Sequence, residues 1–321
     1  MRDQRGRFRE IACEVLETSG RELSHYAPCE EALRQIGVEG GANGKPINLT
    51  PPKRKFIAAM VPGIGWECFE SWLEYENEFS EHLSSLGIQA LIMKVDGLSG
   101  STHNARMIRD AFMEHQDELE PKSVVLIGYS KGSPDALEAL VSYPEIHPYV
   151  AAMISVSGAI GGSPLANDVK DDAANLLTHL PGSECSEGDG LAVDSLRTTT
   201  RKAWLQANPL PDNIPYYSVV TLPTKERVSN ILKSSYRKLA KIDPRNDSQV
   251  IFSDQVIPGS TLLAYLNADH WAISVPVMEA HPVIGKLFVD ENEFPREAMA
   301  EALLRFLLED LAVADEDGNN Q

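Results

Sequence analysis

Short apolar runs alternate with amphipathic stretches through most of the chain. The runs are rich in Val, Ile, Leu and Ala, which is typical of strands buried on both faces of a parallel sheet. The predicted strands are 56–61, 90–95, 124–128, 150–156, 216–222 and 262–266. Helical spacing of apolar residues predicts helices at 69–86, 104–115, 134–142, 224–239 and 295–311. The alternation predicts an α/β fold with a mostly parallel sheet of about six or more strands flanked by helices.

Two stretches depart from this alternation. Residues 1–52 are expected to form an N-terminal extension, helical at 7–17 and 30–36 and ending in a Gly- and Pro-rich linker. The main domain is then 53–321. Within it, residues from about 158 to 215 are polar and rich in loops. An insertion of this length inside a compact domain is usually functional or disordered.

One predicted strand runs directly into Gly128-Tyr129-Ser130-Lys131-Gly132, and a helical pattern follows. Strand, sharp turn at a serine and helix together form the context in which Gly-x-Ser-x-Gly exposes a nucleophilic hydroxyl above a sheet. The glycines are needed because a Cβ at either position would collide with the neighbouring strand and helix. The alternative is a Gly-rich strand end followed by a helix N-cap serine.

On these residues, the chain resembles the α/β-hydrolase family, and its motif resembles those of lipase- and esterase-like serine hydrolases. The resemblance implies the chain order serine, acid, histidine. The family keeps its histidine in the loop after the last strand, where this sequence has Asn267-Ala268-Asp269-His270-Trp271. His270 is therefore the expected general base. His281 is the alternative, but a proline follows it and its surroundings are typical of a surface loop.

The resemblance places the acid after the preceding strand, where an insert makes its identity less direct. The run Asn246-Asp247-Ser248-Gln249-Val250 resembles the Asp-Gly-x-Val turn that carries the acid in many lipases and esterases. Asp247 is the first choice and Asp254 the second. Asp243 is third, because the proline after it indicates a turn-forming role.

The resemblance also implies an oxyanion hole built from backbone N–H groups. One donor is the N–H of Lys131, the residue after the nucleophile. The other is expected from the loop Pro62-Gly63-Ile64, which resembles the His-Gly-aromatic element of lipases. Ile64 N–H is the expected donor, and Gly63 permits close approach of the backbone. Gly63, Trp66 and Trp271 are candidate substrate-pocket residues, and the family position of the 158–215 insertion implies a lid.

These residue types suit ester hydrolysis. A serine hydroxyl becomes an effective nucleophile when an imidazole takes its proton, and a carboxylate orients that imidazole. The resemblance implies a carboxylic ester hydrolase that works through an acyl-enzyme, without a metal or organic cofactor. An acyltransferase or an amide or thioester hydrolase on the same residues is the alternative, as is a non-catalytic binding protein of the same fold.

Composition narrows the partners. The chain has 321 residues, 43% hydrophobic and 24% charged, which is ordinary for a globular domain. Its formal net charge of −18 disfavours nucleic acid and anionic membrane surfaces and leaves small-molecule or lipid-like esters as substrates. It has no apolar run of membrane-spanning length, so stable membrane insertion is not expected. The N-terminus lacks the apolar core of a secretion signal, which favours a cytoplasmic location but leaves export open.

The four cysteines, Cys13, Cys29, Cys68 and Cys185, are scattered and form no C-x-x-C pair. Zinc binding is therefore disfavoured. Reduced thiols are the first expectation, and a Cys13–Cys29 disulfide is the alternative if the protein is exported.

Overall fold

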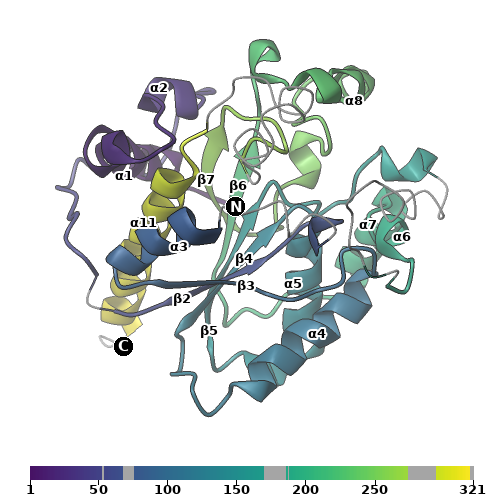
Figure 1. Cartoon of the computed structure of the whole chain (residues 1–321), viewed down its shortest axis with the longest axis horizontal. Helices are drawn as coiled ribbons and strands as arrows, with labels where there is room; N and C mark the ends of the chain where they lie inside the picture. The colour runs from purple at the N-terminus through teal and green to yellow at the C-terminus, as the bar shows by residue number, and fades with distance from the viewer. Residues whose placement is uncertain (53, 68–75, 170–185, 187, 274–293, 319–321) are drawn as a thin grey trace.

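The computed structural model describes residues 1–52, 54–67, 76–169, 186, 188–273 and 294–318. Its centre is a sheet of seven parallel strands in the order β1-β7-β6-β5-β4-β2-β3 (Figure 1). The strands are β1 (Arg2–Asp3), β2 (Ile57–Val61), β3 (Gln89–Ile92), β4 (Val124–Tyr129), β5 (Val150–Val156), β6 (Tyr216–Thr221) and β7 (Thr261–Leu266). The six strands predicted from the apolar runs are confirmed within a few residues. β1 was not predicted, because two residues are too few to show an apolar or alternating pattern.

Helices cover both faces of the sheet. On one face, α4 (Ser101–Glu114) and α5 (Gly132–Ser142) pack on strands β2, β4 and β5 around Leu126 and Met153. On the other face lie α1 (Arg5–Glu17), α3 (Glu76–Ser85) and α11 (Arg296–Gly318) (Figure 1). Their core includes Phe8, Val125 and Leu304. The layers match the α/β class predicted from the alternation of strands and helices.

The N-terminal segment is part of this domain's core. β1 pairs with β7, in the register Arg2 with Thr261, and α1 packs against α11. Phe8 of α1 contacts Phe306 edge to face, with ring centroids 6.3 Å apart. Phe306 in turn contacts Tyr217 of β6 at 6.2 Å. The segment 1–52, set apart by its composition as an extension, therefore shares one hydrophobic core with the rest of the chain.

The helix predicted at 30–36 is shorter than expected. α2 spans only Cys29–Ala32, because Leu33 adopts an extended conformation and bridges antiparallel to Leu266 of β7. The amide of Arg34 donates to the carbonyl of Tyr265 at 2.8 Å. Hydrogen bonds to the sheet thus replace helical ones after Ala32. Helix propensity, which is local in sequence, does not predict this pairing.

The first expectation for the cysteines was wrong for one pair. Cys13 of α1 and Cys29 of α2 form a disulfide, with Cα atoms 5.0 Å apart. Both positions are brought together by the packing of α1 and α2, which is a tertiary contact rather than a sequence pattern. Cys68 and Cys185 lie outside the described residues.

The remaining helix predictions are met in part. The stretch 224–239 is broken into two 3₁₀ turns, Lys225–Arg227 and Asn230–Leu232, followed by α8 (Lys233–Leu239). In the described part of the 158–215 insertion, a 3₁₀ turn (Ala166–Asp168), α6 (Ala192–Ser195) and α7 (Thr198–Ala207) are present. Among the described helices, none has the length and apolar character needed to cross a bilayer.

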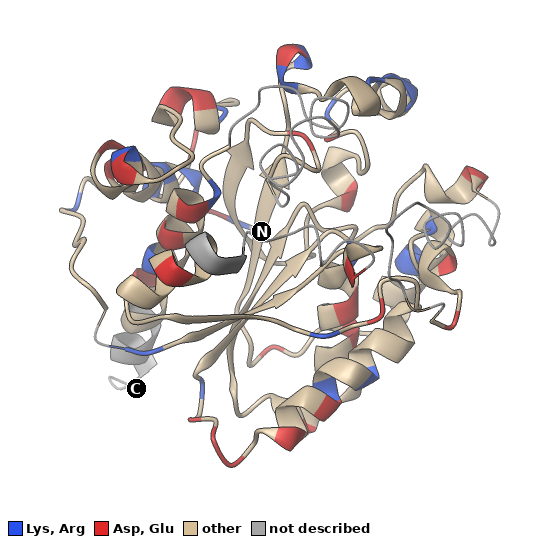
Figure 2. Cartoon of the chain, in the orientation of Figure 1, with Lys and Arg blue, Asp and Glu red and all other residues tan. Residues whose placement is uncertain are grey.

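Acidic residues are spread over most elements of the molecule, whereas lysines and arginines are concentrated on the helix at the place of α8 (Figure 2). The chain has 47 acidic and 29 basic residues, and the two kinds are therefore not evenly distributed over its elements.

Candidate active site

Ser130 occupies a strained turn between β4 and α5. β4 ends at Tyr129, α5 begins at Gly132, and Ser130 itself has φ of +52°. A Cβ on Gly132 would lie 1.9 Å from the carbonyl oxygen of Val61. A Cβ on Gly128 would lie 2.5 Å from the Cα of Ser133. The predicted need for both glycines is confirmed, since backbone atoms leave no room for a side chain.

Three residues distant in sequence meet at this turn. His270 Nε2 lies 2.8 Å from Ser130 Oγ, and His270 Nδ1 lies 2.7 Å from Asp247 Oδ2. Ser130 follows β4, Asp247 lies in the connection after β6, and His270 follows β7. Parallel strands present their carboxyl ends at one edge of the sheet, which is why these segments converge. The structure therefore brings together the serine, histidine and first-choice acid expected from the sequence.

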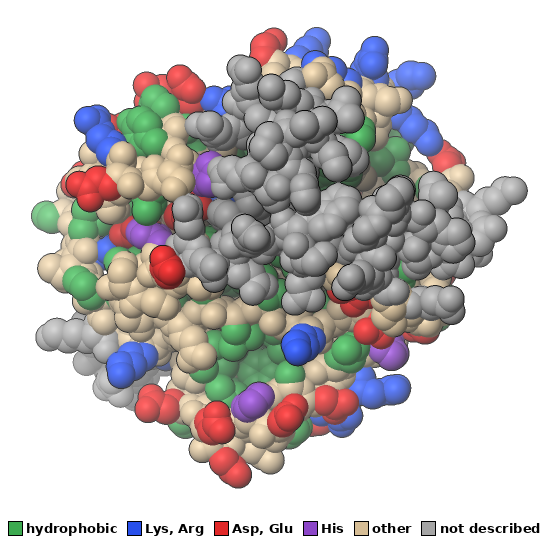
Figure 3. Space-filling model, viewed as in Figure 1, with side chains coloured by type: hydrophobic (Ala, Val, Ile, Leu, Met, Phe, Trp, Pro, Cys, Tyr) green, Lys and Arg blue, Asp and Glu red, His purple; other side chains and the backbone are tan. Residues whose placement is uncertain are grey.

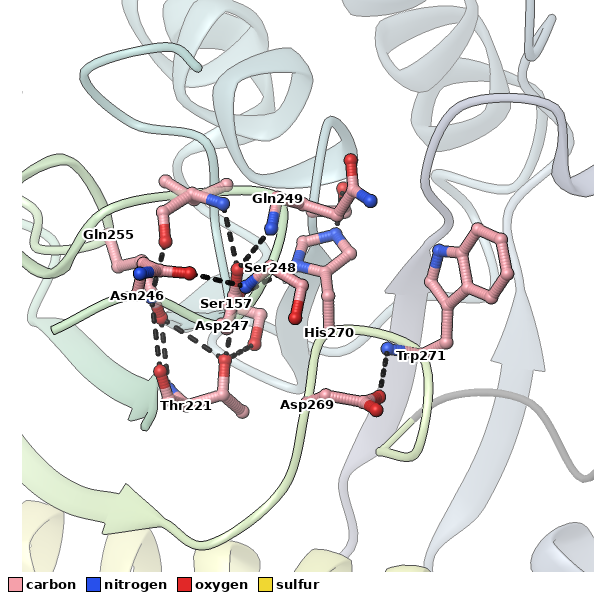
Figure 4. A network of polar contacts seen from close by, with 12 residues as sticks. Ser157, Thr221, Asn246, Asp247, Ser248, Gln249, Gln255, Asp269, His270 and Trp271 are labelled. Atoms are coloured by element: carbon pink, nitrogen blue, oxygen red, sulfur yellow. Dashed lines mark hydrogen bonds and ion pairs between the residues drawn. The ribbon is translucent and has the colours of Figure 1, made fainter. Parts of the chain in front are cut away.

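Both carboxylate oxygens of Asp247 are held by other groups. Oδ1 accepts hydrogen bonds from the backbone N–H groups of Val250, at 2.7 Å, and Gln249, at 2.9 Å. Oδ2 accepts a hydrogen bond from Thr221 Oγ1 at 2.8 Å, beside its contact with His270 (Figure 4). Asp247 is fully buried and His270 only 4% exposed. The carboxylate is thus fixed in orientation and shielded from water.

A buried polar network behind Asp247 was not foreseen from the sequence. Thr221 is the last residue of β6, and its amide donates to Gln255 Oε1 at 2.9 Å. Its hydroxyl also contacts Ser157 Oγ, and Ser157 has a left-handed backbone with φ of +48°. The available signal was position alone: both residues lie at the carboxyl end of a predicted strand, at the edge where Ser130 lies.

The loop that carries His270 is anchored on both sides. The preceding residue, Asp269, is fully buried and accepts hydrogen bonds from Ser229 N–H at 2.7 Å and Trp271 N–H at 3.1 Å. Tyr129 Oη donates to the carbonyl oxygen of His270 at 2.6 Å. These contacts hold the imidazole in register with Ser130. No pattern in the sequence indicated these roles of Asp269, Ser229 and Tyr129.

The two alternative acids pair with basic side chains and not with His270. Asp254 Oδ1 lies 3.6 Å from Lys202 Nζ, and burial raises the pKa of the Asp254 carboxyl. Asp243 pairs with Arg245, with Nη2 and Oδ2 2.9 Å apart. The alternative histidine, His281, lies outside the described residues.

The loop expected to complete an oxyanion hole lies against Ser130. A Cβ on Gly63 would be 3.1 Å from the Cβ of Ser130, so the loop backbone passes directly beside the serine. Within the described part of the chain, the N–H groups of Ile64 and Lys131 have no hydrogen-bond acceptor. Unpaired N–H groups beside a nucleophile are what a developing oxyanion requires. The two candidate pocket tryptophans, Trp66 and Trp271, are half-buried in neighbouring loops.

Behind the turn, Lys131 and Asp135 form a buried ion pair. Lys131 Nζ lies 2.7 Å from Asp135 Oδ2, and each side chain is 1% exposed. Asn104 of α4 donates to the same Asp135 oxygen at 2.7 Å. Nearby, burial raises the pKa of the Glu138 carboxyl and lowers that of the Arg201 guanidinium to about 10. The backbone N–H of Lys131 thus lies next to Ser130, while its side chain is buried against Asp135 of α5.

This geometry can be compared with solved structures. The chain is similar to the metagenomic carboxyl esterase MGS0156, with 34% identity and a TM-score of 0.88 over 97% of this chain and 93% of that chain. The chain belongs to the α/β-hydrolase superfamily. The hydrolase fold is also shared with the lipase BlEst2 of Bacillus licheniformis in its mature form, at 22% identity and TM-score 0.57, covering 77% of this chain and 97% of that chain.

A third similarity in fold, to EstA of Clostridium botulinum, extends over 92% of this chain and 96% of that one, at 11% identity and TM-score 0.53. No protein-family model matches the chain. No curated protein matches it either. The fold class inferred from the motif is confirmed by these structural similarities.

Proposed function

We propose that this α/β-hydrolase cleaves carboxylic esters through an acyl-enzyme formed on Ser130. The observation that carries the proposal is the hydrogen-bonded line from Ser130 Oγ through His270 to Asp247, with contacts of 2.8 and 2.7 Å. Similarity to a carboxyl esterase over nearly the whole chain supports the same reaction class. The proposed substrate is a small-molecule or lipid-like ester.

In the first half-reaction, Ser130 Oγ attacks the ester carbonyl carbon while His270 Nε2 takes its proton. Asp247 stabilises the imidazolium through its contact with Nδ1 and holds the ring in orientation. The carbonyl oxygen becomes an oxyanion that accepts hydrogen bonds from the N–H groups of Lys131 and Ile64. Such preorganised donors typically contribute about 10²–10³ in kcat for each donor.

The tetrahedral intermediate then collapses. His270 donates its proton to the alkoxide oxygen, the alcohol leaves, and the acyl group remains on Ser130. In the second half-reaction, His270 takes a proton from water, and the resulting hydroxide adds to the acyl carbon. The second intermediate collapses by returning the proton to Ser130 Oγ, which releases the carboxylic acid and restores the starting site.

We further propose that Gly63, Trp66 and Trp271 line the substrate pocket. Gly63 is adjacent to Ser130, and Trp271 follows His270, with its indole extending away from the Asp247 side of the ring (Figure 4). The segment 158–215 is proposed as the lid, on the basis of its place between β5 and β6. A lid there would exclude water and limit acyl length.

The test is hydrolysis of p-nitrophenyl esters from acetate to palmitate, with wild type beside Ser130→Ala. A fluorophosphonate probe is followed by intact mass. We expect turnover and adduct to be lost together in the variant, and the chain-length profile to separate esterase from lipase activity. An adduct at Ser130 without ester turnover would redirect the proposal to amides or thioesters. A folded protein that forms no adduct would refute it. Partition to an added alcohol or amine would indicate acyl transfer.

A further inference from the structure

A basic face lies beside the proposed active site, on residues 225–245. This stretch holds seven Lys and Arg residues against two Asp and Glu residues, in a chain whose overall balance is 29 to 47. The cations are Lys225, Arg227, Lys233, Arg237, Lys238, Lys241 and Arg245. Figure 2 shows basic residues concentrated on the helix at the place of α8. The local charge is therefore opposite in sign to the net charge.

Part of this positive charge is neutralised by ion pairs. Three cations pair with acids, namely Arg227 with Glu31, Lys238 with Asp168 and Arg245 with Asp243. Three others form no salt bridge with any acid in the described ranges, namely Lys225, Arg237 and Lys241. All three are exposed to solvent. Lys225 lies beside the carboxyl of Glu226, whereas no described ion pair offsets the charges of Arg237 and Lys241.

Two large apolar side chains accompany these cations. Ile231 is 43% exposed and Ile242 is 61% exposed, whereas Leu232 and Leu239 of the same stretch are buried. The stretch therefore has an anchored inner side and an outer side that mixes isoleucine with lysine and arginine. Figure 3 shows basic side chains along this margin of the molecule, with hydrophobic surface beside them. Cations interspersed with exposed apolar residues are the combination found on proteins that bind lipid surfaces.

The basic face adjoins the candidate active site through the chain. Ser229, near its start, donates its amide and hydroxyl protons to Asp269, the neighbour of His270. Its end at Arg245 precedes Asp247 by two residues. α8 lies at the end of the sheet to which β6 and β7 point (Figure 1). A surface bound by this face would therefore lie close to the site where an ester is cleaved.

We propose that residues 225–245 dock the protein on the surface of an anionic phospholipid bilayer. Charge complementarity favours this partner, and the exposed isoleucines can enter the headgroup boundary. The net charge of −18 opposes docking only weakly, because salt screens charges beyond about 8–10 Å. A chain of this length has a radius of gyration of about 20 Å, so most acidic residues lie beyond that range. The local charge thus overrides the expectation drawn from the whole chain.

The experiment is co-sedimentation with vesicles of phosphatidylcholine, alone or mixed with phosphatidylglycerol. Wild type is compared with Arg237→Glu/Lys241→Glu. The matched control is Lys94→Glu/Arg106→Glu, which makes the same charge change at exposed positions outside the basic face. Each cation near an anionic surface multiplies binding roughly fivefold, so the first variant should lose at least about tenfold. The control should bind the vesicles like wild type, and high salt should release both of these proteins from the vesicles.

Three results would overturn the docking proposal. The first is wild-type binding that does not depend on phosphatidylglycerol. The second is an equal loss of binding in both variants. The third is binding to a soluble polyanion such as heparin without binding to vesicles, which would assign the face to a different partner. Sedimentation does not require turnover, so its failure is distinguishable from failure of the hydrolase proposal. Equal midpoints of urea unfolding would show that all variants remain folded.

Discussion

Thr221 and His270 meet on one oxygen of Asp247. Thr221 Oγ1 donates to Asp247 Oδ2 at 2.8 Å, and His270 Nδ1 contacts the same atom at 2.7 Å. Removing the hydroxyl with Thr221→Val would keep the side-chain shape and free the carboxylate to rotate. A hydrogen bond to a charged group contributes about 1.5 kcal/mol or more. We expect kcat for ester hydrolysis to fall roughly tenfold with little change in KM.

Thr221→Ser is the matched control for this position, because it keeps the hydroxyl and should retain most activity. Steady-state kinetics on one soluble ester would measure all three proteins. Unchanged kcat in Thr221→Val would mean that the two backbone donors to Oδ1 suffice to orient Asp247.

The glycine at the start of α5 should tolerate no side chain. In Gly132→Ala, the new Cβ would clash with the backbone oxygen of Val61, 1.9 Å away, and no rotamer change can relieve that contact. We expect a loss of about 3 kcal/mol or more in the free energy of unfolding. Gly87→Ala is the comparison, since Gly87 has a left-handed φ of +77° but nothing within 4 Å. It should lose only about 1–2 kcal/mol, measured by urea unfolding.

Replacing one member of the buried ion pair behind Ser130 should destabilise the fold, whereas replacing both members together should cost much less. Lys131→Met would leave the Asp135 carboxylate, 1% exposed, without its cation. Breaking one half of a buried pair typically costs about 3–5 kcal/mol. The double variant Lys131→Met/Asp135→Leu should recover much of that loss, because an apolar pair needs no charge compensation. Urea unfolding of both variants tests this, and additive losses would contradict it.

Glu138 should make stability depend on pH in the opposite sense to a carboxyl group whose pKa is lowered on folding. Burial raises the pKa of its carboxyl above the ordinary value of 4.5, against an opposing hydrogen bond from Thr102. A raised folded-state pKa means that the folded state binds the proton more tightly than the unfolded state. The resulting stabilisation is complete below the unfolded pKa and is lost as pH rises through the folded pKa.

Glu138→Gln should therefore be more stable than wild type at neutral pH. This advantage should shrink as pH falls through the raised folded-state pKa of Glu138 and should be lost by about pH 4.5. Unfolding free energies of both proteins across that range provide the measurement. Parallel pH profiles would show that Glu138 has the same proton affinity in both states.

The Cys13–Cys29 disulfide should be present in protein purified without reductant. It closes a loop with a sequence separation of 16, for which chain entropy gives about 3 kcal/mol. Intact mass should drop by the hydrogens lost on oxidation, and Cys13→Ser/Cys29→Ser should unfold at lower urea. A stable bond would favour an oxidising compartment. Thiols that remain free in air-equilibrated protein would contradict the pairing.

Patterns local in sequence were sufficient for the central features of the fold. Apolar runs of β-branched residues predicted six of the strands, because burial on both faces of a parallel sheet imposes that composition. The run Gly128-Tyr129-Ser130-Lys131-Gly132 indicated the turn, because a backbone squeezed between a strand and a helix excludes side chains at both glycines. His270 and Asp247 followed from resemblance and chain order, and their positions beside Ser130 agree with that order.

Other features depended on contacts between distant segments, which no local pattern encodes. β1 forms only because Arg2 and Asp3 pair with the edge of β7, and α2 ends because Leu33 bridges to the same strand. Thr221 and Ser157 meet only when β5 and β6 lie side by side. The net charge did not indicate the basic face on residues 225–245, because a sum over the whole chain does not say where the charges lie. Tertiary structure decided these features because their free energy comes from long-range packing and pairing.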